Sequence, residues 1–441
     1  MNRLHLSVFF VCGICLAYIC IQFSEFFKWS SRERESQNRK CYSLLPKDSQ
    51  LRVVDEDHPR IYFSKTAGVI KEKGSEVEAL SSMNAALEMK TEGKPDKALK
   101  LFKHANSLAP KHPDILNNYG EFLEEIQNNV ILADQFYFQA LMYCPNHEKA
   151  LINRQRTAKL VDEMESDMLK RIDGKRDHIS SIPDTDKGLQ RAKKEAYFQH
   201  IHHTVGIEGN TMSLSQTRSV VETQMAISGK SILEHNEILG LDAALKYINA
   251  TLVNRFGPIR VKDVLEIHRR VLGFVDPFGS GELRRTQVYV GGHIPPPPSD
   301  IPPLMREFEE WLNSEHAVRM HPIKYAALAH YKLVRIHPFD DGNGRTSRLL
   351  MNAILMQAGF PPVIILKQDR HRYYEYLEMA NEGDVRPFVR FIAECTEKTL
   401  DMFLWSTQEF ISRIPAIDDD SKTIKISTHQ NNLTSDPNGT P

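Results

Sequence analysis

The sequence lacks an excess of charge of either sign. Its 441 residues include 56 Lys and Arg and 57 Asp and Glu, which gives a formal net charge of −1. A chain that binds nucleic acid along its surface usually carries a clear basic excess. The balance therefore argues against a nucleic-acid partner, while leaving room for a local basic groove.

Cysteines are few, and their spacing matches neither a metal site nor a disulfide-rich domain. Of the six, Cys12, Cys15 and Cys20 lie in the first apolar stretch. The other three are scattered: Cys41, Cys144 and Cys395. We interpret these three as ordinary thiols, so the cysteines leave the redox compartment open.

The N-terminus also lacks a small-residue cleavage site, because bulky residues continue from Ile19 to Phe27. Residues 6–23 are apolar apart from Ser7 and Gln22, a length at the lower edge of what crosses a bilayer as a helix. This favours an uncleaved signal anchor over a removed signal peptide. We expect a transmembrane helix within residues 1–24 and a polar stalk over 25–79.

The side of the membrane stays open on composition. Arg3 precedes the apolar stretch, and five basic residues follow it: Lys28, Arg32, Arg34, Arg39 and Lys40. This bias places the body in the cytosol. Three glycosylation sequons point to a lumenal body instead, although a chain of this length carries a few by chance. They are Asn249, Asn432 and Asn438.

Residues 80–147 contain an internal repeat. Ala98, Phe102, Ala105 and Pro110 recur as Ala133, Phe136, Ala140 and Pro145, at an offset of 34 or 35 residues. Small residues, an aromatic and a closing proline at this period are typical of tetratricopeptide repeats. The alternative is a plain pair of helical hairpins. We expect Gly93 at the first turn, a capping linker helix within 148–188, and a hinge over 173–186.

The stretch from His337 to Arg348, His-Pro-Phe-Asp-Asp-Gly-Asn-Gly-Arg-Thr-Ser-Arg, separates two apolar helical patterns. Gly342 and Gly344 permit positive φ, so backbone N–H groups can point outward beside a helix N-terminus. Such a turn is a phosphate nest. It predicts a helix–loop–helix that binds a polyphosphate.

The charged residues of this stretch fit the same chemistry. Arg345 and Arg348 are three residues apart, so they share a helix face and can grip one polyphosphate. Asp341 beside them suits a Mg²⁺ held between carboxylate and phosphates. His337, neutral at pH 7, could take a proton from a hydroxyl.

Every fixed position of the Fic signature, His-x-Phe-x-Asp-Gly-Asn-Gly-Arg-x-x-Arg, is present, so the chain resembles the Fic family. The resemblance implies that His337 is the general base, Asp341 binds Mg²⁺ or Mn²⁺, and the two arginines hold the phosphates of ATP. It implies transfer of AMP to a Ser, Thr or Tyr hydroxyl of a protein. The nucleotide would also contact the rest of the turn: Gly342, Asn343, Gly344, Thr346 and Ser347.

Residues 204–209 resemble the Fic inhibitory motif, with Thr204, Glu208 and Gly209 at its fixed positions. In that family the glutamate pairs with the second arginine, here Arg348, and occupies the place of the γ-phosphate. A helix C-terminus without inhibitory role is the alternative. The resemblance also implies that Glu208 orients a water for removal of AMP.

Residues 286–294 read as a β-hairpin flap around a Gly-Gly turn. In Fic proteins such a flap binds the target by strand addition. The resemblance places four flap residues and three others around the nucleotide: Val290, Gly291, Gly292, His293, Tyr373, Tyr374 and Asn381.

The order of segments resembles the endoplasmic-reticulum Fic enzymes of animals. We therefore expect a mostly α-helical chain, with a Fic domain over 189–400 and a C-terminal helix end and disordered tail over 401–441. The resemblance implies a type II protein of the endoplasmic-reticulum membrane with a lumenal body. It also implies a BiP-type chaperone as substrate, and a homodimer formed near Ile232 and Gly273.

Two other interpretations remain. In the first, the same fold transfers phosphocholine or another nucleotide, although the complete arginine pair favours a triphosphate. In the second, the chain is a tetratricopeptide adaptor with an inactive Fic core, although its motif is intact.

Overall fold

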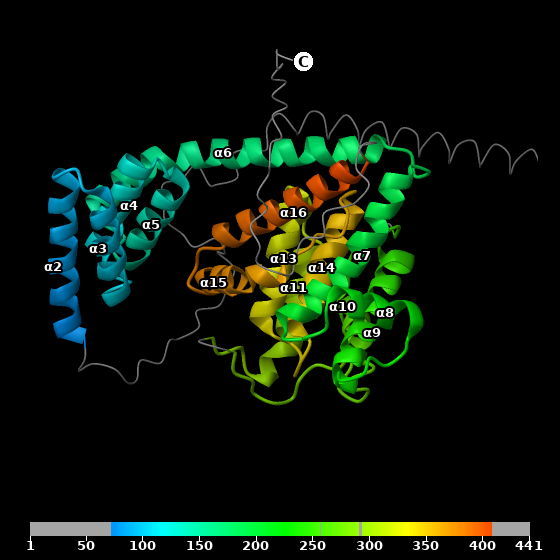
Figure 1. Cartoon of the computed structure of the whole chain (residues 1–441). Helices are drawn as coiled ribbons and strands as arrows, with labels where there is room; N and C mark the ends of the chain where they lie inside the picture. Colours follow the sequence, from blue (N-terminus) through cyan, green and yellow to red (C-terminus); the bar gives the residue numbers. More distant parts are fainter. Residues whose placement is uncertain (1–71, 256, 291–292, 408–441) are drawn as a thin grey trace, which may run out of the picture. The chain divides into compact units, whose positions relative to one another are not determined.

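The computed structural model describes residues 72–255, 257–290 and 293–407, so the expected anchor, most of the stalk and the tail lie outside the described residues. The described chain is mostly α-helical, as predicted (Figure 1). It forms two compact units that divide between Asp167 and Met168. In the described ranges, no helix has the length and apolar character needed to cross a membrane.

The first unit contains two helical hairpins. Their helices are α2 (Glu72–Thr91), α3 (Pro95–Leu108), α4 (Pro113–Gln127) and α5 (Val130–Tyr143). Gly93 has a φ of +70° and makes the turn between α2 and α3, where the repeat pattern required one. Ala98 and Ala133, equivalent positions of the repeat, are both fully buried. Two stacked hairpins fit either interpretation of the repeat, so the tetratricopeptide assignment stays a prediction.

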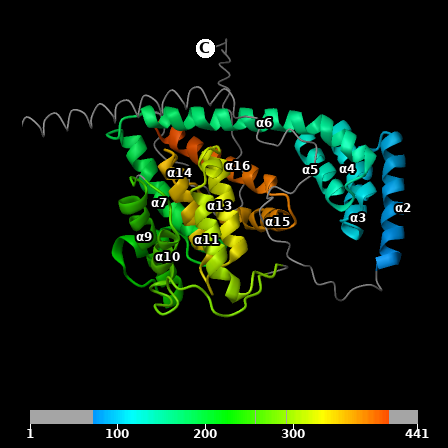
Figure 2. The same cartoon turned by 180° about the vertical axis from the view of Figure 1, so that it is seen from behind.

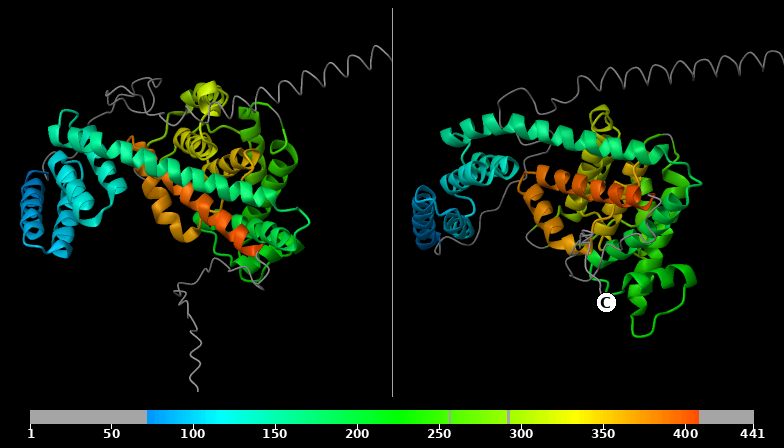
Figure 3. Two further views of the ribbon diagram at one scale, coloured as in Figure 1. Left: turned by 90° about the horizontal axis from the view of Figure 1, so that it is seen from above. Right: turned by 45° about the horizontal axis from the view of Figure 1, so that its top comes forward.

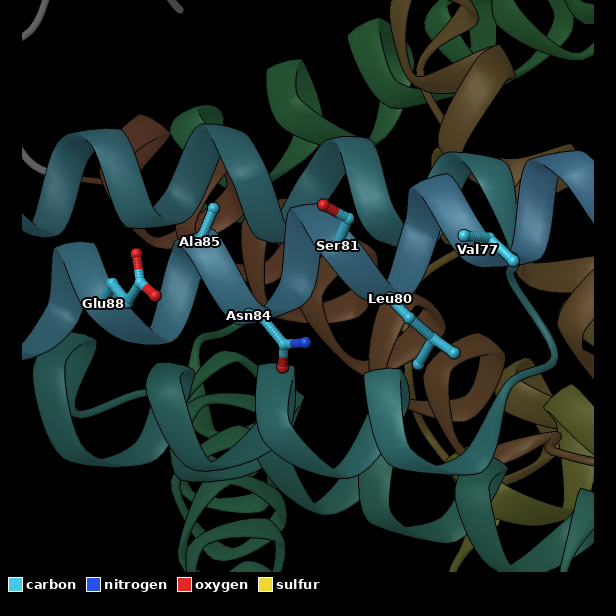
Figure 4. Close-up of a pocket in the computed structure, with 6 residues that line it drawn as sticks. All are labelled: Val77, Leu80, Ser81, Asn84, Ala85 and Glu88. Atoms are coloured by element: carbon cyan, nitrogen blue, oxygen red, sulfur yellow. The ribbon is translucent and has the colours of Figure 1, made fainter.

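Helix α2 begins at Glu72, inside the segment expected to be a stalk. Its buried face consists largely of small residues, Ala79 and Ala86 among them, so its apolar pattern is weak. On another face of α2, six residues line a shallow groove: Val77, Leu80, Ser81, Asn84, Ala85 and Glu88 (Figure 4). Three of these residues are apolar and three are polar.

Helix α6 (Glu148–Ser181) runs through most of the expected hinge. Gly174 lies inside the helix, and a Cβ there would meet nothing within 4 Å. The break is confined to residues 182–186, where Pro183 interrupts the chain and Asp186 caps the next helix through a bond from Leu189 N. In the second unit, Glu397 of α16 binds Arg171 of α6 at 2.6 Å, and Figure 3 shows these helices side by side.

The second unit is built around one antiparallel helix pair, α13 (Pro322–Ile336) and α14 (Asn343–Gln357), visible near its middle in Figures 1 and 2. Ala326 and Ala329 on α13 are fully buried, which lets the two helices approach closely. The other helices of this unit surround the pair: α7 (Lys187–Ile207), α8 (Leu214–Thr223), α9 (Ile232–Tyr247), η1 (Ile248–Leu252), α10 (Val261–Leu272), η2 (Pro298–Asp300), α11 (Ile301–Leu312), α12 (Glu315–Val318), η3 (Lys367–Asp369), α15 (Arg370–Asn381) and α16 (Arg386–Ser406).

The segment expected to form a hairpin contains one antiparallel bridge, between Val290 and His293. Val290 N donates to His293 O at 3.1 Å, and His293 N donates to Val290 O at 2.9 Å. Gly291 and Gly292 lie outside the described residues. On the approach to the bridge, side-chain bonds hold the backbone, since Gln287 Nε2 donates to Pro295 O at 2.9 Å. Among the described residues of the flap, pairing consists of this one bridge, so the β-hairpin stays a prediction.

Candidate active site

The loop between α13 and α14 begins at His337, which terminates α13 in the left-handed conformation, with φ of +51°. Its imidazole is half-buried, with Nδ1 3.2 Å from Val334 O, so Nε2 is directed away from the helix end. Burial lowers the pKa of His337, and the positive charge of Arg284 adds to this effect. The imidazole is therefore neutral at pH 7 and can accept a proton.

Two buried side chains fix the shape of the loop. Asn343 Nδ2 donates to Phe339 O at 2.8 Å, and its Oδ1 accepts from Phe339 N at 3.0 Å. The ring of His268 on α10 stacks on Phe339 with centroids 3.6 Å apart. His268 Nε2 donates to Asp341 O at 2.9 Å, and Nδ1 accepts from Gly281 N at 2.9 Å. Because burial lowers the pKa of His268 to about 4, this neutral tautomer persists at physiological pH.

The N-terminus of α14 forms the predicted anion cradle. Gly342 is the N-cap, with φ of +77°, and it has no side chain to cap the helix. The first N–H groups of an α-helix have no intrahelical partner. Together with the helix dipole, the N–H groups of Asn343, Gly344 and Arg345 therefore favour an anion here.

A carboxylate of the chain itself occupies this cradle. Glu208 ends α7, and its Oε1 accepts a hydrogen bond from Arg348 Nη2 at 2.5 Å. A Cβ built on Gly344 would lie only 2.5 Å from Glu208 Oε1, so the carboxylate rests directly against the glycine turn. Position 344 therefore needs glycine, because the anion approaches the backbone where a side chain would begin.

Arg348 is 1% exposed and is held by several partners at once. Besides Glu208, Nη2 donates to Thr204 O at 3.0 Å, and Nη1 donates to Tyr373 Oη at 3.3 Å. Burial disfavours its charge, but Glu208 and Tyr373 hold the pKa of Arg348 above its usual value. The guanidinium is a fixed, permanently charged anion receptor.

Arg345, also buried, is held between two carboxylates. Its Nη2 lies 2.8 Å from Asp341 Oδ2 and its Nη1 3.4 Å from Glu237 Oε1. Glu237 Oε2 in turn accepts from Asn210 Nδ2 at 2.8 Å. Arg345 is thus linked through Glu237 to the segment that follows Glu208.

Asp341 is exposed, and its Oδ1 accepts from Gly342 N at 2.6 Å. Across the described ranges, no group of three or more His, Cys, Asp or Glu side chains could hold a metal by itself. Mg²⁺ commonly binds one or two carboxylates and completes its shell with water and substrate phosphates. A single exposed carboxylate beside a phosphate cradle fits that requirement.

The two tyrosines predicted to contact the nucleotide occupy different environments. Tyr373 is 1% exposed, and its hydroxyl lies 3.0 Å from His330 Nε2 as well as bonding to Arg348. Tyr374 is 41% exposed and donates to Glu208 Oε2 at 3.4 Å. Tyr373 therefore supports the anion site by binding Arg348, a role that the sequence did not suggest. Asn381, the third predicted residue, ends α15 and is half-buried.

Thr346 and Ser347, in the first turn of α14, are both fully buried, so the nucleotide would meet the backbone of this turn and the two arginines. Gly209 follows Glu208 with φ of +108°. Among the remaining predicted residues, Asn249 is exposed, and Ile232 is 77% exposed at the start of α9. Gly273 follows the last residue of α10.

Sequence reasoning missed three residues of the site: Glu237, His268 and Arg284. Arg284 donates from Nε to His337 O at 2.7 Å. Each of the three lies 50 or more residues from its partner, which is in the loop for His268 and Arg284 and in the first turn of α14 for Glu237, so spacing gave no signal. These contacts depend on how the helices pack in the fold.

Comparisons with known proteins identify relatives of this chain. Residues 258–355 match the pattern of the Fic/DOC family. A protein adenylyltransferase Fic of Aedes aegypti is 65% identical over 343 residues, which cover 78% of this chain and 69% of that protein. The corresponding protein of Culex quinquefasciatus is 64% identical over 345 residues, covering the same shares.

A solved structure of Fic-1 from C. elegans is similar to this chain with a TM-score of 0.69 and 42% identity. The similarity covers 74% of this chain and 98% of that one. The resemblance seen in the signature is confirmed by these relatives. The chain belongs to the Fic family of protein adenylyltransferases.

Proposed function

We propose that this protein transfers AMP from ATP to a Ser, Thr or Tyr hydroxyl of a lumenal BiP-type chaperone, and that Glu208 inhibits the transfer. The observation that carries the proposal is the Glu208 carboxylate on Arg348, 2.5 Å away, at the N-terminus of α14. A group of the chain already uses this cradle as an anion site. A phosphate of ATP is also an anion, and its oxygens accept hydrogen bonds from the same donors.

In the transfer step, the target hydroxyl oxygen attacks the α-phosphorus of ATP and pyrophosphate leaves. His337 Nε2 takes the hydroxyl proton, which its lowered pKa allows at neutral pH. Arg345 and Arg348 bind the phosphates and stabilise the charge that develops on them. A Mg²⁺ or Mn²⁺ held by Asp341 would supply further neutralisation of the phosphate charge.

Inhibition follows from competition for one receptor. Arg348 binds Glu208 through Nη2 and cannot bind a phosphate oxygen there at the same time. Tyr374 supports the other oxygen of this carboxylate, which keeps Glu208 in the cradle. We further propose that Glu208 orients a water that hydrolyses the AMP–protein bond, while His337 returns a proton to the leaving hydroxyl.

The test uses the full-length chain with [α-³²P]ATP and a purified BiP-type chaperone. Glu208→Gly should raise AMP transfer roughly 10- to 150-fold, because a charge-assisted hydrogen bond contributes ~1.5–3 kcal/mol. Adding His337→Ala should lower that rate about 100- to 10,000-fold, the usual contribution of a general base.

The label and the mass of the product separate this proposal from its alternatives. Label from [α-³²P]ATP but none from [γ-³²P]ATP, with a mass gain of AMP, supports adenylyl transfer. An unlabelled chaperone in every variant would favour the inactive adaptor, and another mass gain would favour another donor.

We propose that the body lies in the lumen of the endoplasmic reticulum, anchored through the apolar stretch near the N-terminus. Asn249 supports this, because residues 249–251 of its sequon are exposed on η1, as a glycosylated asparagine requires. In sealed microsomes, we expect protection from added protease and an endoglycosidase-sensitive glycan. Cleavage of the body in intact vesicles would place it in the cytosol instead.

We also propose a homodimer. Ile232 and Leu233 on α9 are 77% and 54% exposed, and Phe274, beside Gly273, is 52% exposed. Asn236 Nδ2 donates to Phe274 O at 2.7 Å, which joins the two segments into one apolar surface. Exposed apolar surface of this kind often marks a protein interface, and here it coincides with the positions that the family resemblance suggested.

A further inference from the structure

Arg284 is a buried side chain that joins three backbone segments. It is 2% exposed and lies between α10 and the flap. Its Nε donates to His337 O at 2.7 Å, Nη1 to Thr286 O at 2.8 Å, and Nη2 to Pro296 O at 2.5 Å. Each edge of the guanidinium therefore holds a different carbonyl.

These carbonyls belong to residues near the two groups that the reaction must align, which are the catalytic base and the flap. His337 carries the base, Thr286 lies where the chain enters the flap, and Pro296 lies where it leaves. We use the term flap stem for residues 286–290 and 293–296. One side chain thus connects both sides of the flap stem to the backbone of the base.

Two further bonds run between the same segments. Arg284 N donates to Pro338 O at 2.9 Å, and Thr286 Oγ1 donates to Asp340 Oδ1 at 2.8 Å. The flap stem and the loop after His337 therefore behave as one bonded body. Because the first of these bonds comes from the backbone, it survives substitution of the Arg284 side chain.

Only a guanidinium suits this position. It offers five N–H donors in a rigid plane, whereas a lysine ammonium is a compact point charge on a flexible stem. Burial lowers the pKa of Arg284, so holding a cation here costs stability. If the flap stem needed only packing, an apolar side chain could fill this position without the loss of stability that burying a cation causes.

We propose that Arg284 is a positioning residue that fixes the separation between the flap stem, which would hold the target peptide, and His337, which would deprotonate its hydroxyl. The inference rests on the proposed function. It makes binding of the target and placement of the base depend on one side chain. A displacement of about 1 Å at a reacting centre can cost roughly 100-fold in rate.

The kinetic test compares Arg284→Lys with Arg285→Lys, both in the full-length Glu208→Gly protein. Arg285 is the exposed neighbour in sequence, so its substitution controls for charge and chain position. For Arg284→Lys we expect a fall in kcat for AMP transfer to the chaperone of about 10- to 100-fold. The Kd for Mg-ATP should stay within about twofold, because the α14 cradle is untouched.

A fall in kcat without a change in the Kd for Mg-ATP distinguishes a positioning role of Arg284 from a general structural role. A general loss of structure would weaken Mg-ATP binding and transfer together, and that outcome would overturn the proposal. Transfer by Arg284→Lys equal to that of Arg285→Lys would also overturn it.

A second measurement is independent of activity. Hydrogen exchange of Arg284→Lys should be faster both in residues 286–290 and in residues 339–340, with no change for Arg285→Lys. Unchanged exchange in either segment would contradict the coupling. If the Glu208→Gly parent transfers no AMP, the proposed function fails, and the exchange result still decides whether Arg284 joins the two segments.

Discussion

At the scale of single residues, the site consists of charged groups whose protonation is set by burial. His337 and His268 face the same loop, yet one is half-buried with room to exchange a proton and the other is stacked and fully hydrogen-bonded. The difference explains why two imidazoles near one phosphate cradle have different roles. His337 is placed for chemistry, and His268 holds the backbone.

The pH dependence of transfer follows from the environment of His337. Burial, Arg284 and His293 lower its pKa, while Val334 O and Asp341 act in the opposite direction with smaller effect. Because the base must be neutral, transfer should fall only as pH drops below 6.5 and should be constant from pH 7 to 8. The check is a profile of kcat/KM for the Glu208→Gly protein.

The sign of this prediction is fixed by the lowered pKa. A profile whose acid midpoint lies above 6.5 would contradict a buried neutral imidazole and would indicate that another group limits the rate. The prediction is supported if the rate falls in acid with a midpoint below pH 6.5 and if single substitutions elsewhere in the loop leave this fall in place. Loss of folding at acid pH is excluded by a parallel measurement of circular dichroism.

At the scale of elements, the site is the meeting point of two helix ends. The N-terminus of α14 supplies unpaired N–H groups, and the C-terminus of α7 supplies Glu208. The sequence predicted the N-terminus of α14, because Gly342 and Gly344 stand beside an apolar helical pattern, and it offered a helix C-terminus at Glu208 and Gly209 as an alternative interpretation. It could not predict that Gly344 is the surface against which the carboxylate rests.

Gly344→Ala tests the cradle directly. In the Glu208→Gly background, the new Cβ would obstruct the approach of phosphate to the backbone, so we expect the Kd for Mg-ATP to rise at least about tenfold. The helix itself should not suffer, since alanine is favoured over glycine in a helix by ~1 kcal/mol. Calorimetric titration and thermal unfolding measure the two effects.

Gly174→Ala provides the matched control, because this glycine lies inside α6 with open space around it. It should leave Mg-ATP binding unchanged. If Gly344→Ala bound Mg-ATP as tightly as its parent, the phosphates would have to lie elsewhere, and the assignment of the cradle would be wrong.

At the scale of the whole molecule, the sequence predicted the helical class and the helix–loop–helix from local pattern. The contact between Glu208 and Arg348, which are 140 residues apart, was expected only from the resemblance to the Fic family. It did not predict Glu237, which is 108 residues from Arg345, or the three carbonyls held by Arg284. These contacts depend on which helices pack together. Two helix ends also differ from those expected. Helix α2 begins at Glu72, inside the expected stalk, because its apolar pattern is weak, and α6 continues to Ser181, through most of the expected hinge, because it tolerates Gly174.

The proposed dimer is a property of the entire chain. Ile232→Asp places a charge in the apolar surface of α9, so we expect the protein to sediment as a monomer at concentrations where the parent is a dimer. Val318→Asp on α12 is the matched control, since Val318 is 63% exposed outside that surface. A parent that sediments as a monomer throughout would exclude the dimer.

The Glu208–Arg348 contact has a consequence for how the enzyme could be controlled in a cell. A competitor tethered to its receptor cannot be diluted, and its effective concentration is set by the chain. Arg348 is almost completely shielded from water, so mobile ions screen this pair little. Changes in enzyme abundance or in salt should therefore leave the resting state unaltered, and release requires an event that moves the end of α7 itself.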